Sequence, residues 1–353
     1  MTTESLAGDE RSGSVAPVQV PHQVHAVPNE SVAEPTAGMV LHRVLAMSAR
    51  TFLLNDMGNE LADHAGRNET VDALSLRMGT RPLWAQSAVG SLNGTERRQT
   101  ETEQIHQSRV ALRRIRSNLR TFRLVLDPAW GTSLRAELAW YGNRLGQIRD
   151  LHIMRDIITV TGPEVIGAGQ VARLESELTA RTAAALADIA AERGKPRRFQ
   201  LTEQMMVLWD GPAFKPKASK PAAEVLPPML KRAWHDLRGA ARTARKDPSD
   251  IHLHKLRIRL KDLRYGCETV ALVEGGPARK TAKAAESLQS KLGDLHDACY
   301  AIAWFEVLAG ERPDLAGPID ELIAAQRDAA AASRKGWKKD LKEVERRWRG
   351  WQG

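Results

Sequence analysis

Apolar residues recur at helical spacing along most of the chain from residue 40 onward. Leu41, Leu45 and Phe52 are part of a pattern that predicts a first helix over 40–57. The same periodicity predicts further helices over 104–126, 131–158, 165–193, 199–209, 222–246, 250–274, 277–308 and 318–349. No segment alternates with a period of two over a useful length, so the predicted fold class is all-α.

Composition between the helices divides the chain. Residues 1–36 are rich in proline and small polar residues without periodicity, which predicts a disordered tail. A Gly-, Asn- and Thr-rich insert over 60–103 interrupts a first half that spans 37–210. Residues 211–221 read as an exposed linker, and the second half spans 222–350.

The two halves repeat one another. The segment IHQSRVALRRIRSNLRTF (105–122) aligns with LHKLRIRLKDLRYGCETV (253–270) at an offset of 148 residues. The segment LGQIRD (145–150) aligns with LGDLHD (292–297) at an offset of 147. Because the order and spacing of both matches agree, we interpret the halves as homologous helical repeats.

Each repeat carries a one-sided stripe of cations. On a helical wheel the first set falls within an arc of roughly 100° beside the apolar arc, and it comprises His106, Arg109, Arg113, Arg116, Arg120 and Arg123. The second set is His254, Arg257, Lys261 and Arg264. Cations of one sign that abut an apolar face are expected to line a groove where helices meet, and they need anionic compensation. That compensation comes either from a ligand or from carboxylates of neighbouring helices, for which the candidates are Asp150, Asp156, Asp294 and Asp297.

Overall charge agrees with an anionic partner. Lys and Arg number 52 against 43 Asp and Glu, and 37 of the cations are arginine, which favours forked contacts to oxyanions. Only Cys267 and Cys299 occur, which excludes a disulfide framework and a cysteine-built zinc site. No apolar run is long enough to span a bilayer and the amino terminus lacks a signal-peptide pattern, so we expect a cytoplasmic protein whose partner is a polyanion.

Enzymatic and metal chemistry find little support in the sequence. Glu103 and His106 form a Glu-x-x-His pair, but the second repeat has Ile251 in place of the glutamate, so no metal site is expected. A histidine phosphotransfer module needs one exposed histidine, whereas here His106 and His254 recur in both repeats. These histidines either donate to an anion or are packed and hydrogen-bonded. No nucleophile elbow or P-loop occurs, so neither catalysis nor a cofactor is expected.

Other polar and aromatic residues receive mainly structural interpretations. Asp150 and Asp297 could bind a metal or act as bases, but we favour a role in orienting arginines of the preceding helix by charge-assisted hydrogen bonds. Arg149 and His296 occupy matching positions and are expected to contribute to the basic surface. Basic residues and tryptophans alternate near the carboxyl end, a pattern that serves nucleic acid or a membrane surface in some proteins. We favour a core role for these tryptophans.

The paired His-x-x-Arg-x-x-x-Arg/Lys-x-x-Arg signatures, each followed by Leu-Gly-x-x-Arg/His-Asp, resemble the CHAD domain, the conserved-histidine α-helical domain. The resemblance covers about residues 38–350 apart from the insert. It implies two four-helix bundles related by pseudo-twofold symmetry, with a basic central cavity between them that binds inorganic polyphosphate. CHAD domains are often fused to a CYTH triphosphatase domain, but no Glu-x-Glu-x-Lys tract is present, so the chain looks like a stand-alone binding module.

The sequence therefore predicts a non-enzymatic polyphosphate-binding protein. Inorganic polyphosphate is the expected partner, with other polyanions as alternatives, and the expected location is the cytoplasm, with polyphosphate granules as one site of association there. The expected binding residues are His106, Arg109, Arg113, Arg116, Arg120, His254, Arg257, Lys261, Arg264, Arg149 and His296. The alternative is a nucleic-acid-binding helical scaffold, against which the two basic helices offer only Phe122 and Tyr265 as aromatic residues.

Overall fold

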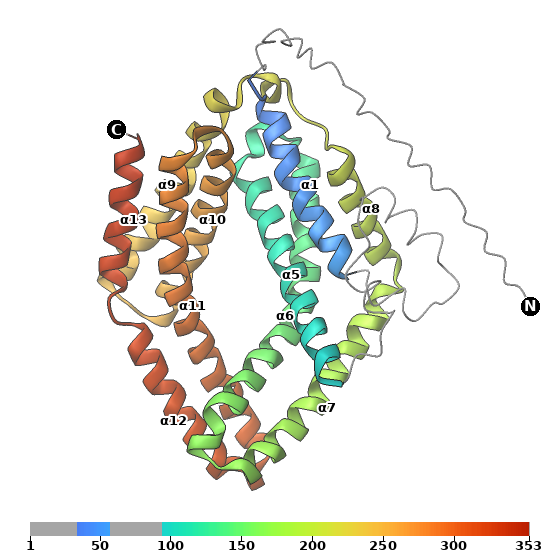
Figure 1. The fold of residues 1–353 in the computed structure, drawn as a ribbon, viewed down its shortest axis with the longest axis vertical. Coiled ribbons are helices and arrows are strands. Elements are labelled where there is room, and N and C mark those ends of the chain that lie inside the picture. Colours follow the sequence, from blue (N-terminus) through green and yellow to red (C-terminus); the bar gives the residue numbers. More distant parts are fainter. Residues whose placement is uncertain (1–33, 57–93, 353) are drawn as a thin grey trace, which may run out of the picture. The chain divides into compact units, whose positions relative to one another are not determined.

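The computed structural model (Figure 1) describes residues 34–56 and 94–352 and confirms the all-α prediction, because these residues contain helices and two isolated β-bridges but no strand. In the first half the helices are α1 (Ala37–Asp56), α5 (Gly94–Thr121), α6 (Pro128–Val165), α7 (Ala168–Arg193) and α8 (Pro196–Asp210). In the second half they are α9 (Ala222–Lys246), α10 (Asp250–Glu274), α11 (Gly276–Glu311), α12 (Ala316–Ser333) and α13 (Trp337–Gln352). The short 3-10 turns are η1 (Arg123–Val125), η2 (Pro216–Ser219) and η3 (Pro313–Leu315).

The prediction that the last helix is continuous is wrong. The range 318–349 was expected to form one helix, but the structure breaks it into α12 and α13. Gly336, immediately before α13, has φ 78°, a left-handed backbone conformation that glycine adopts without steric cost. The break turns the chain so that the Trp337 side chain is buried.

Two predicted irregular segments also differ from the structure. Helix α5 begins at Gly94, so the last ten positions of the predicted insert are helical; the rest of the insert up to residue 93 lies outside the described residues, as does the predicted tail up to residue 33. The predicted linker 211–221 is not simply exposed, because its residue Ala218 is buried against Gly38 at the start of α1. The Lys215 amide also donates to the Val125 carbonyl at 3.0 Å.

The beginnings of α1 and α9 pair with each other. The Ala37 amide donates to the Lys220 carbonyl at 3.0 Å, and the Ala222 amide donates to the Pro35 carbonyl at 2.9 Å. The two donors, Ala37 and Ala222, lie 185 positions apart, and so do the two acceptors, Pro35 and Lys220. Each half therefore donates to the other half through equivalent residues. Contacts that exchange in this way are the pattern that a local twofold axis produces between two copies of one unit.

Helices α5 and α10 meet through contacts that show the same exchange. Arg114 of α5 pairs with Glu268 of α10, and Arg120 of α5 pairs with Asp262 of α10. At the repeat offset of 148, Arg114 corresponds to Asp262 and Arg120 corresponds to Glu268. The two ion pairs are therefore equivalent contacts with their charges reversed.

A second exchanged contact lies one turn away on the same two helices. The Thr269 hydroxyl donates to the Asn118 side-chain carbonyl at 2.9 Å. In the exchanged position, Gly266 faces Thr121, where an added Cβ would lie 3.3 Å from the threonine methyl group. Gly266 thus leaves room for Thr121 of α5 and also for Leu230 of α9, whose side chain an added Cβ would overlap.

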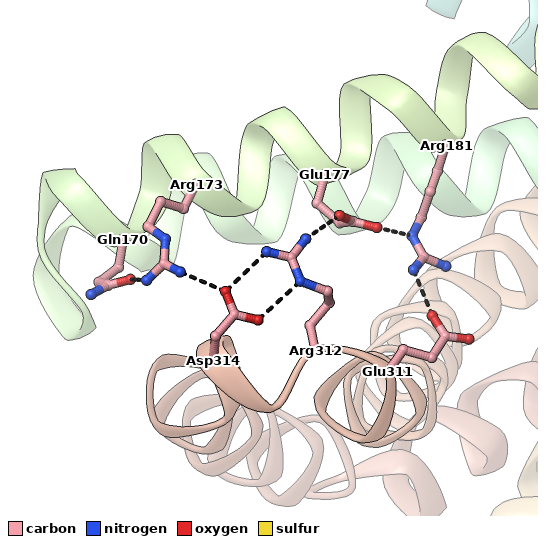
Figure 2. Close-up of polar contacts among 7 residues, drawn as sticks. All are labelled: Gln170, Arg173, Glu177, Arg181, Glu311, Arg312 and Asp314. Carbon is pink, nitrogen blue, oxygen red and sulfur yellow. Dashed lines mark hydrogen bonds and ion pairs between the residues drawn. The ribbon is translucent and has the colours of Figure 1, made fainter.

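A separate apolar cluster joins the far ends of α6 and α7 to those of α11 and α12. Its buried members include Met154, Ile158, Leu174, Leu178, Phe305, Leu308, Ile319 and Leu322. Figure 2 shows an ionic network that also joins α7 to the end of α11 and to the η3 turn. Its contacts are Arg173–Asp314 at 2.6 Å, Arg312–Glu177 at 2.6 Å and Arg181–Glu311 at 2.5 Å. The two halves are thus joined at a second place, formed by the carboxyl-terminal part of α6 with α7 and the carboxyl-terminal part of α11 with α12.

A buried ionic group fixes the end of α1. The carboxylate of Asp56 pairs with Arg198 of α8 and accepts a hydrogen bond of 2.9 Å from the Tyr141 hydroxyl of α6. Although burial disfavours the charged guanidinium, Asp56 and Tyr141 raise the pKa of Arg198. These three residues link three helices of the first half through one closed set of polar contacts.

Candidate functional site

The helical repeat places the predicted cations along one edge of α5 and one edge of α10. The apolar residues beside them are fully buried, for example Leu112 and Ile115 on α5 and Leu256 and Leu260 on α10. The cations themselves are half-buried. Side chains at these positions therefore keep their charged ends close to the helix junction instead of in open solvent.

The first arginine of each stripe lies against the glycine of a Leu-Gly segment on the neighbouring helix. A Cβ added to Gly146 of α6 would overlap Nη1 of Arg109, and this guanidinium donates to the Gly142 carbonyl at 3.3 Å. In the second repeat, a Cβ on Gly293 of α11 would lie 3.4 Å from Nε and Nη2 of Arg257. The two sequence motifs of each repeat are therefore parts of one structural unit, in which an arginine crosses the neighbouring helix at a glycine.

Four cations from the two repeats, Arg109, Arg113, Arg257 and Lys261, form what we call the central cluster. The positive charges of Arg257, Arg113 and Arg109 all act on Lys261, which places the four groups around one locus. Burial, reinforced by these neighbours, lowers the pKa of Lys261 to about 6. Burial and the charge of Arg113 lower the pKa of Arg109 to about 10.

The members of the central cluster are not neutralised by direct ion pairs. Among the described residues, none of its four members forms an ion pair. Their one hydrogen bond to another described residue is that from Arg109 to the Gly142 carbonyl. The buried Nε atoms of Arg113 and Arg257 have no hydrogen-bond partner. A buried donor without a partner is costly, so this arrangement is suited to accept an anion.

Asp150 and Asp297 lie close enough to screen the central cluster. Burial raises the pKa of both carboxyl groups, whereas Arg109 opposes the shift at Asp150 and Arg257 opposes it at Asp297. Interaction with the Tyr300 hydroxyl also opposes the upward shift of the pKa of Asp150. Neither carboxylate forms the expected charge-assisted hydrogen bond to the arginine of the preceding helix within the described residues, so their influence on the arginines is exerted through space.

The predicted histidines flank the cluster. His254 and His296 contact each other, with their Nδ1 atoms 3.1 Å apart. Burial and the neighbouring His254 lower the pKa of His296 to about 4, and burial lowers the pKa of His254 and of His106. At neutral pH these rings are therefore uncharged, and each offers at most one N–H donor.

Three of the predicted binding residues are already paired with carboxylates. Arg120 contacts Asp262, and Arg264 contacts both Glu268 and Glu286, the latter at 2.6 Å. Arg149 lies 3.8 Å from Asp156, a longer and more exposed contact. The sequence left open whether carboxylates of neighbouring helices or a ligand compensate these cations. For Arg120 and Arg264 the structure shows compensation by carboxylates of the protein itself.

Arg135 is a site residue that the sequence interpretation missed. It lies on α6 near Arg116 and Arg120, and their charges act on one another. Burial and the charge of Arg135 lower the pKa of Arg116. The available signal was its spacing, because Arg135 precedes Gly142 by seven residues and therefore falls on the face of α6 that contacts α5.

Two tryptophans near the carboxyl end and the possible metal ligands were also candidates in the sequence. Trp337 and Trp348 are buried, as the favoured core interpretation expects. The described residues contain no group of three His, Cys, Asp or Glu side chains placed to hold a metal ion. No helix in the part of the chain that the structure describes is long and apolar enough to cross a membrane.

Comparisons with known proteins agree with the repeated motifs. The family model of the CHAD domain matches residues 85–306. Among solved structures, the CHAD domain from the plant Ricinus communis is 20% identical, with a TM-score of 0.63 over 89% of this chain and 93% of that one. PptA from Streptomyces chartreusis is 22% identical, with a TM-score of 0.59 over 87% of this chain and 99% of that one. No curated protein sequence matches the chain.

Proposed function

The chain belongs to the CHAD domain family, and from this premise we propose that it binds inorganic polyphosphate at the central cluster. The observation that carries the proposal is the group of four half-buried cations from two repeats that lack acidic partners among the described residues. A chain of phosphates supplies the missing negative charge and accepts hydrogen bonds from the buried Nε atoms of Arg113 and Arg257.

The spacing of the cations suits a linear ligand. Positions three and four apart on a helix lie about one turn, roughly 5.4 Å, along its axis. Successive phosphates of a flexible chain can therefore reach Arg109, Arg113 and Arg116 in turn, and Arg135 extends the same path on α6. Arg120 and Arg264 contribute less, because carboxylates already neutralise them.

The surroundings of the cluster favour a slender polyanion over a nucleic acid. Phe122, directly after α5, and Tyr265 of α10 are both buried and unavailable for base stacking. The cations are half-buried, so a ligand without sugars and bases approaches them more closely. Nucleic acid remains the second candidate because it shares the electrostatic attraction.

We propose binding without hydrolysis. The charges of Asp150 and Asp297 act on the cluster, and both carboxylates lie among arginine charges that would repel a divalent cation. Purified protein is expected to leave the length of polyphosphate unchanged when Mg²⁺ or Mn²⁺ is added. Phosphate release that disappears in the variants Asp150→Asn or Asp297→Asn would place the protein among enzymes.

A competition experiment tests the choice of ligand. Labelled polyphosphate is bound to the protein and displaced by unlabelled polyphosphate, single-stranded RNA or duplex DNA, at equal concentrations of negative charge. We expect polyphosphate to displace the label at a concentration at least tenfold below that of either nucleic acid. Equal or better displacement by RNA or DNA would favour the nucleic-acid-binding alternative.

A further inference from the structure

A second group of cations surrounds a hollow of about 400 Å³ between α9 and α13. No residue of this hollow belongs to the two repeated motifs. Its walls are Trp234, Arg238, Arg242 and Arg245 of α9, with Glu345 and Arg349 of α13. The volume lies within the range of small-molecule sites, roughly 300–1,000 Å³.

Two contacts fix the walls of the hollow. The Trp234 ring stacks on Trp348 of α13, with ring centroids 4.8 Å apart and an interplanar angle of 13°. Nη2 of Arg245 lies 2.8 Å from Oε1 of Glu345. This ion pair engages the one carboxylate among the lining residues, and it joins the two helices across the hollow.

The other three lining arginines lack this compensation. In the described part of the chain, Arg238, Arg242 and Arg349 form no ion pair or hydrogen bond. Arg238 and Arg242 lie one helical turn apart on α9, where like charges repel. Arg349 approaches from α13, so the positive charge converges on the hollow from both helices.

We propose that this hollow is a second anion site, which binds an oligophosphate group of three or more negative charges, either free or carried by a nucleoside. The forked guanidinium groups match phosphate oxygens, and three of them match the charge of such a group. Trp234 supplies a flat wall on which a nucleobase could lie. The site is independent of the central cluster, because it shares no residue with it.

The test uses a protein whose central cluster has been weakened. In the background Arg113→Gln with Lys261→Gln, binding of inorganic triphosphate and of ATP is titrated by calorimetry. The second-site variant adds Arg238→Gln with Arg349→Gln, one change on each helix. The matched control adds Arg232→Gln with Lys342→Gln, which removes the same charge from exposed positions of α9 and α13 that do not line the hollow.

We expect the background protein to retain one site for triphosphate, and the second-site variant to bind it at least about tenfold more weakly, while the control stays within about twofold. Equal affinity for triphosphate and ATP would identify a free oligophosphate as the ligand. Tighter binding of ATP that Trp234→Phe reduces would identify a nucleotide. Both results support the proposed site.

Loss of all triphosphate binding in the background protein would overturn the second site and leave the central cluster intact. Equal weakening in the control would also overturn it, since the effect would then come from net charge. Conversely, if the background protein binds long polyphosphate as tightly as the unaltered chain, the proposal for the central cluster fails while the second site is still tested by its own variants.

Discussion

Arg114 of α5 and Asp262 of α10 occupy corresponding positions in the two repeats and carry opposite charges. Arg114 forms an ion pair with α10, and Asp262 forms one with α5. Arg114 contacts Glu268, and Asp262 contacts Arg120. The repeats have therefore kept the contact positions while exchanging the sign of the charges. These pairs hold α5 against α10, which brings Arg113 close to Arg257 and Lys261.

The Asp56–Arg198 pair offers a test of the fold alone. Asp56 is fully buried, so Asp56→Ala leaves the buried guanidinium of Arg198 without its carboxylate. We expect the free energy of unfolding to fall by about 3–5 kcal/mol. Denaturant titration measures this loss, and Arg327→Gln, which removes an exposed partner of Glu306, should cost less than about 1 kcal/mol. A loss below that level for Asp56→Ala would show that the ionic group does not fix the end of α1.

A substitution at Gly146, the glycine beside Arg109, should change polyphosphate binding without reducing stability. An alanine at Gly146 displaces the Arg109 guanidinium, whereas helix propensity favours alanine by about 1 kcal/mol. We expect Gly146→Ala to weaken polyphosphate binding at least threefold without loss of stability. Gly293→Ala should change binding less, because its Cβ would lie at an ordinary 3.4 Å from Arg257. Parallel measurements of affinity and denaturant midpoint check both outcomes, and unchanged affinity in Gly146→Ala would contradict the role assigned to the glycine.

Arg116 and Arg264 correspond in sequence but differ in their partners. Arg264 is held by Glu268 and Glu286, whereas Arg116 and Arg135 act on each other as like charges. We expect Arg116→Gln with Arg135→Gln to weaken polyphosphate binding at least tenfold and to preserve stability. Arg264→Gln should reduce stability by about 1 kcal/mol with little change in affinity. If the two variants behave alike in a titration of polyphosphate, the path does not extend along α6.

We expect Lys261 to make polyphosphate binding depend on pH. Its pKa of about 6 in the folded protein lies below the ordinary value for lysine, so the unfolded chain binds an extra proton between about pH 6 and pH 10. Stability of the free protein should therefore rise with pH in that window. A bound polyanion favours the charged ammonium, so binding takes up a proton and weakens as the pH rises from 6 to 9.

Calorimetry in buffers of different ionisation enthalpy measures this proton uptake. Long-chain polyphosphate is the suitable ligand, because its few terminal phosphates contribute little titration of their own. We expect uptake approaching one proton at pH 7.5, and none in Lys261→Met. Lys255→Met, an exposed position on the same helix, should retain the uptake of the unaltered protein. Equal uptake by Lys261→Met would assign the proton to another group.

The sequence predicts the stripes well because the helical period alone determines which residues share a face. His106, Arg109 and Arg113 follow the expected edge of α5, and the repeat places Arg257 and Lys261 on the corresponding edge of α10. Periodicity does not reveal which carboxylate approaches from another helix. The pairing of Arg120 with Asp262 depends on contact between residues 142 positions apart, which no local pattern encodes.

The missed features have similar causes. Arg135 lies on a different helix from the stripe it extends, so it becomes a neighbour of Arg116 only after α5 and α6 pack. The break before α13 depends on one glycine within a segment whose apolar spacing continues on both sides. In each case the helix was predictable, whereas its packing partner or its end was determined by tertiary contact.

The salt dependence of polyphosphate affinity tests the central claim most directly. In the free protein near neutral pH, Arg113→Gln with Lys261→Gln removes one repelling arginine charge and a buried lysine that is largely uncharged, so the denaturant midpoint should be unchanged or higher. Its affinity should fall at least tenfold, and the slope of log affinity against log salt should become shallower by somewhat under one unit for each lost contact. The control Arg144→Gln with Lys255→Gln, at exposed positions of α6 and α10, should leave the denaturant midpoint, the affinity and the salt slope unchanged. Marked destabilisation of the first variant with unaltered affinity, or an equal loss of affinity in the control, would contradict binding at the central cluster.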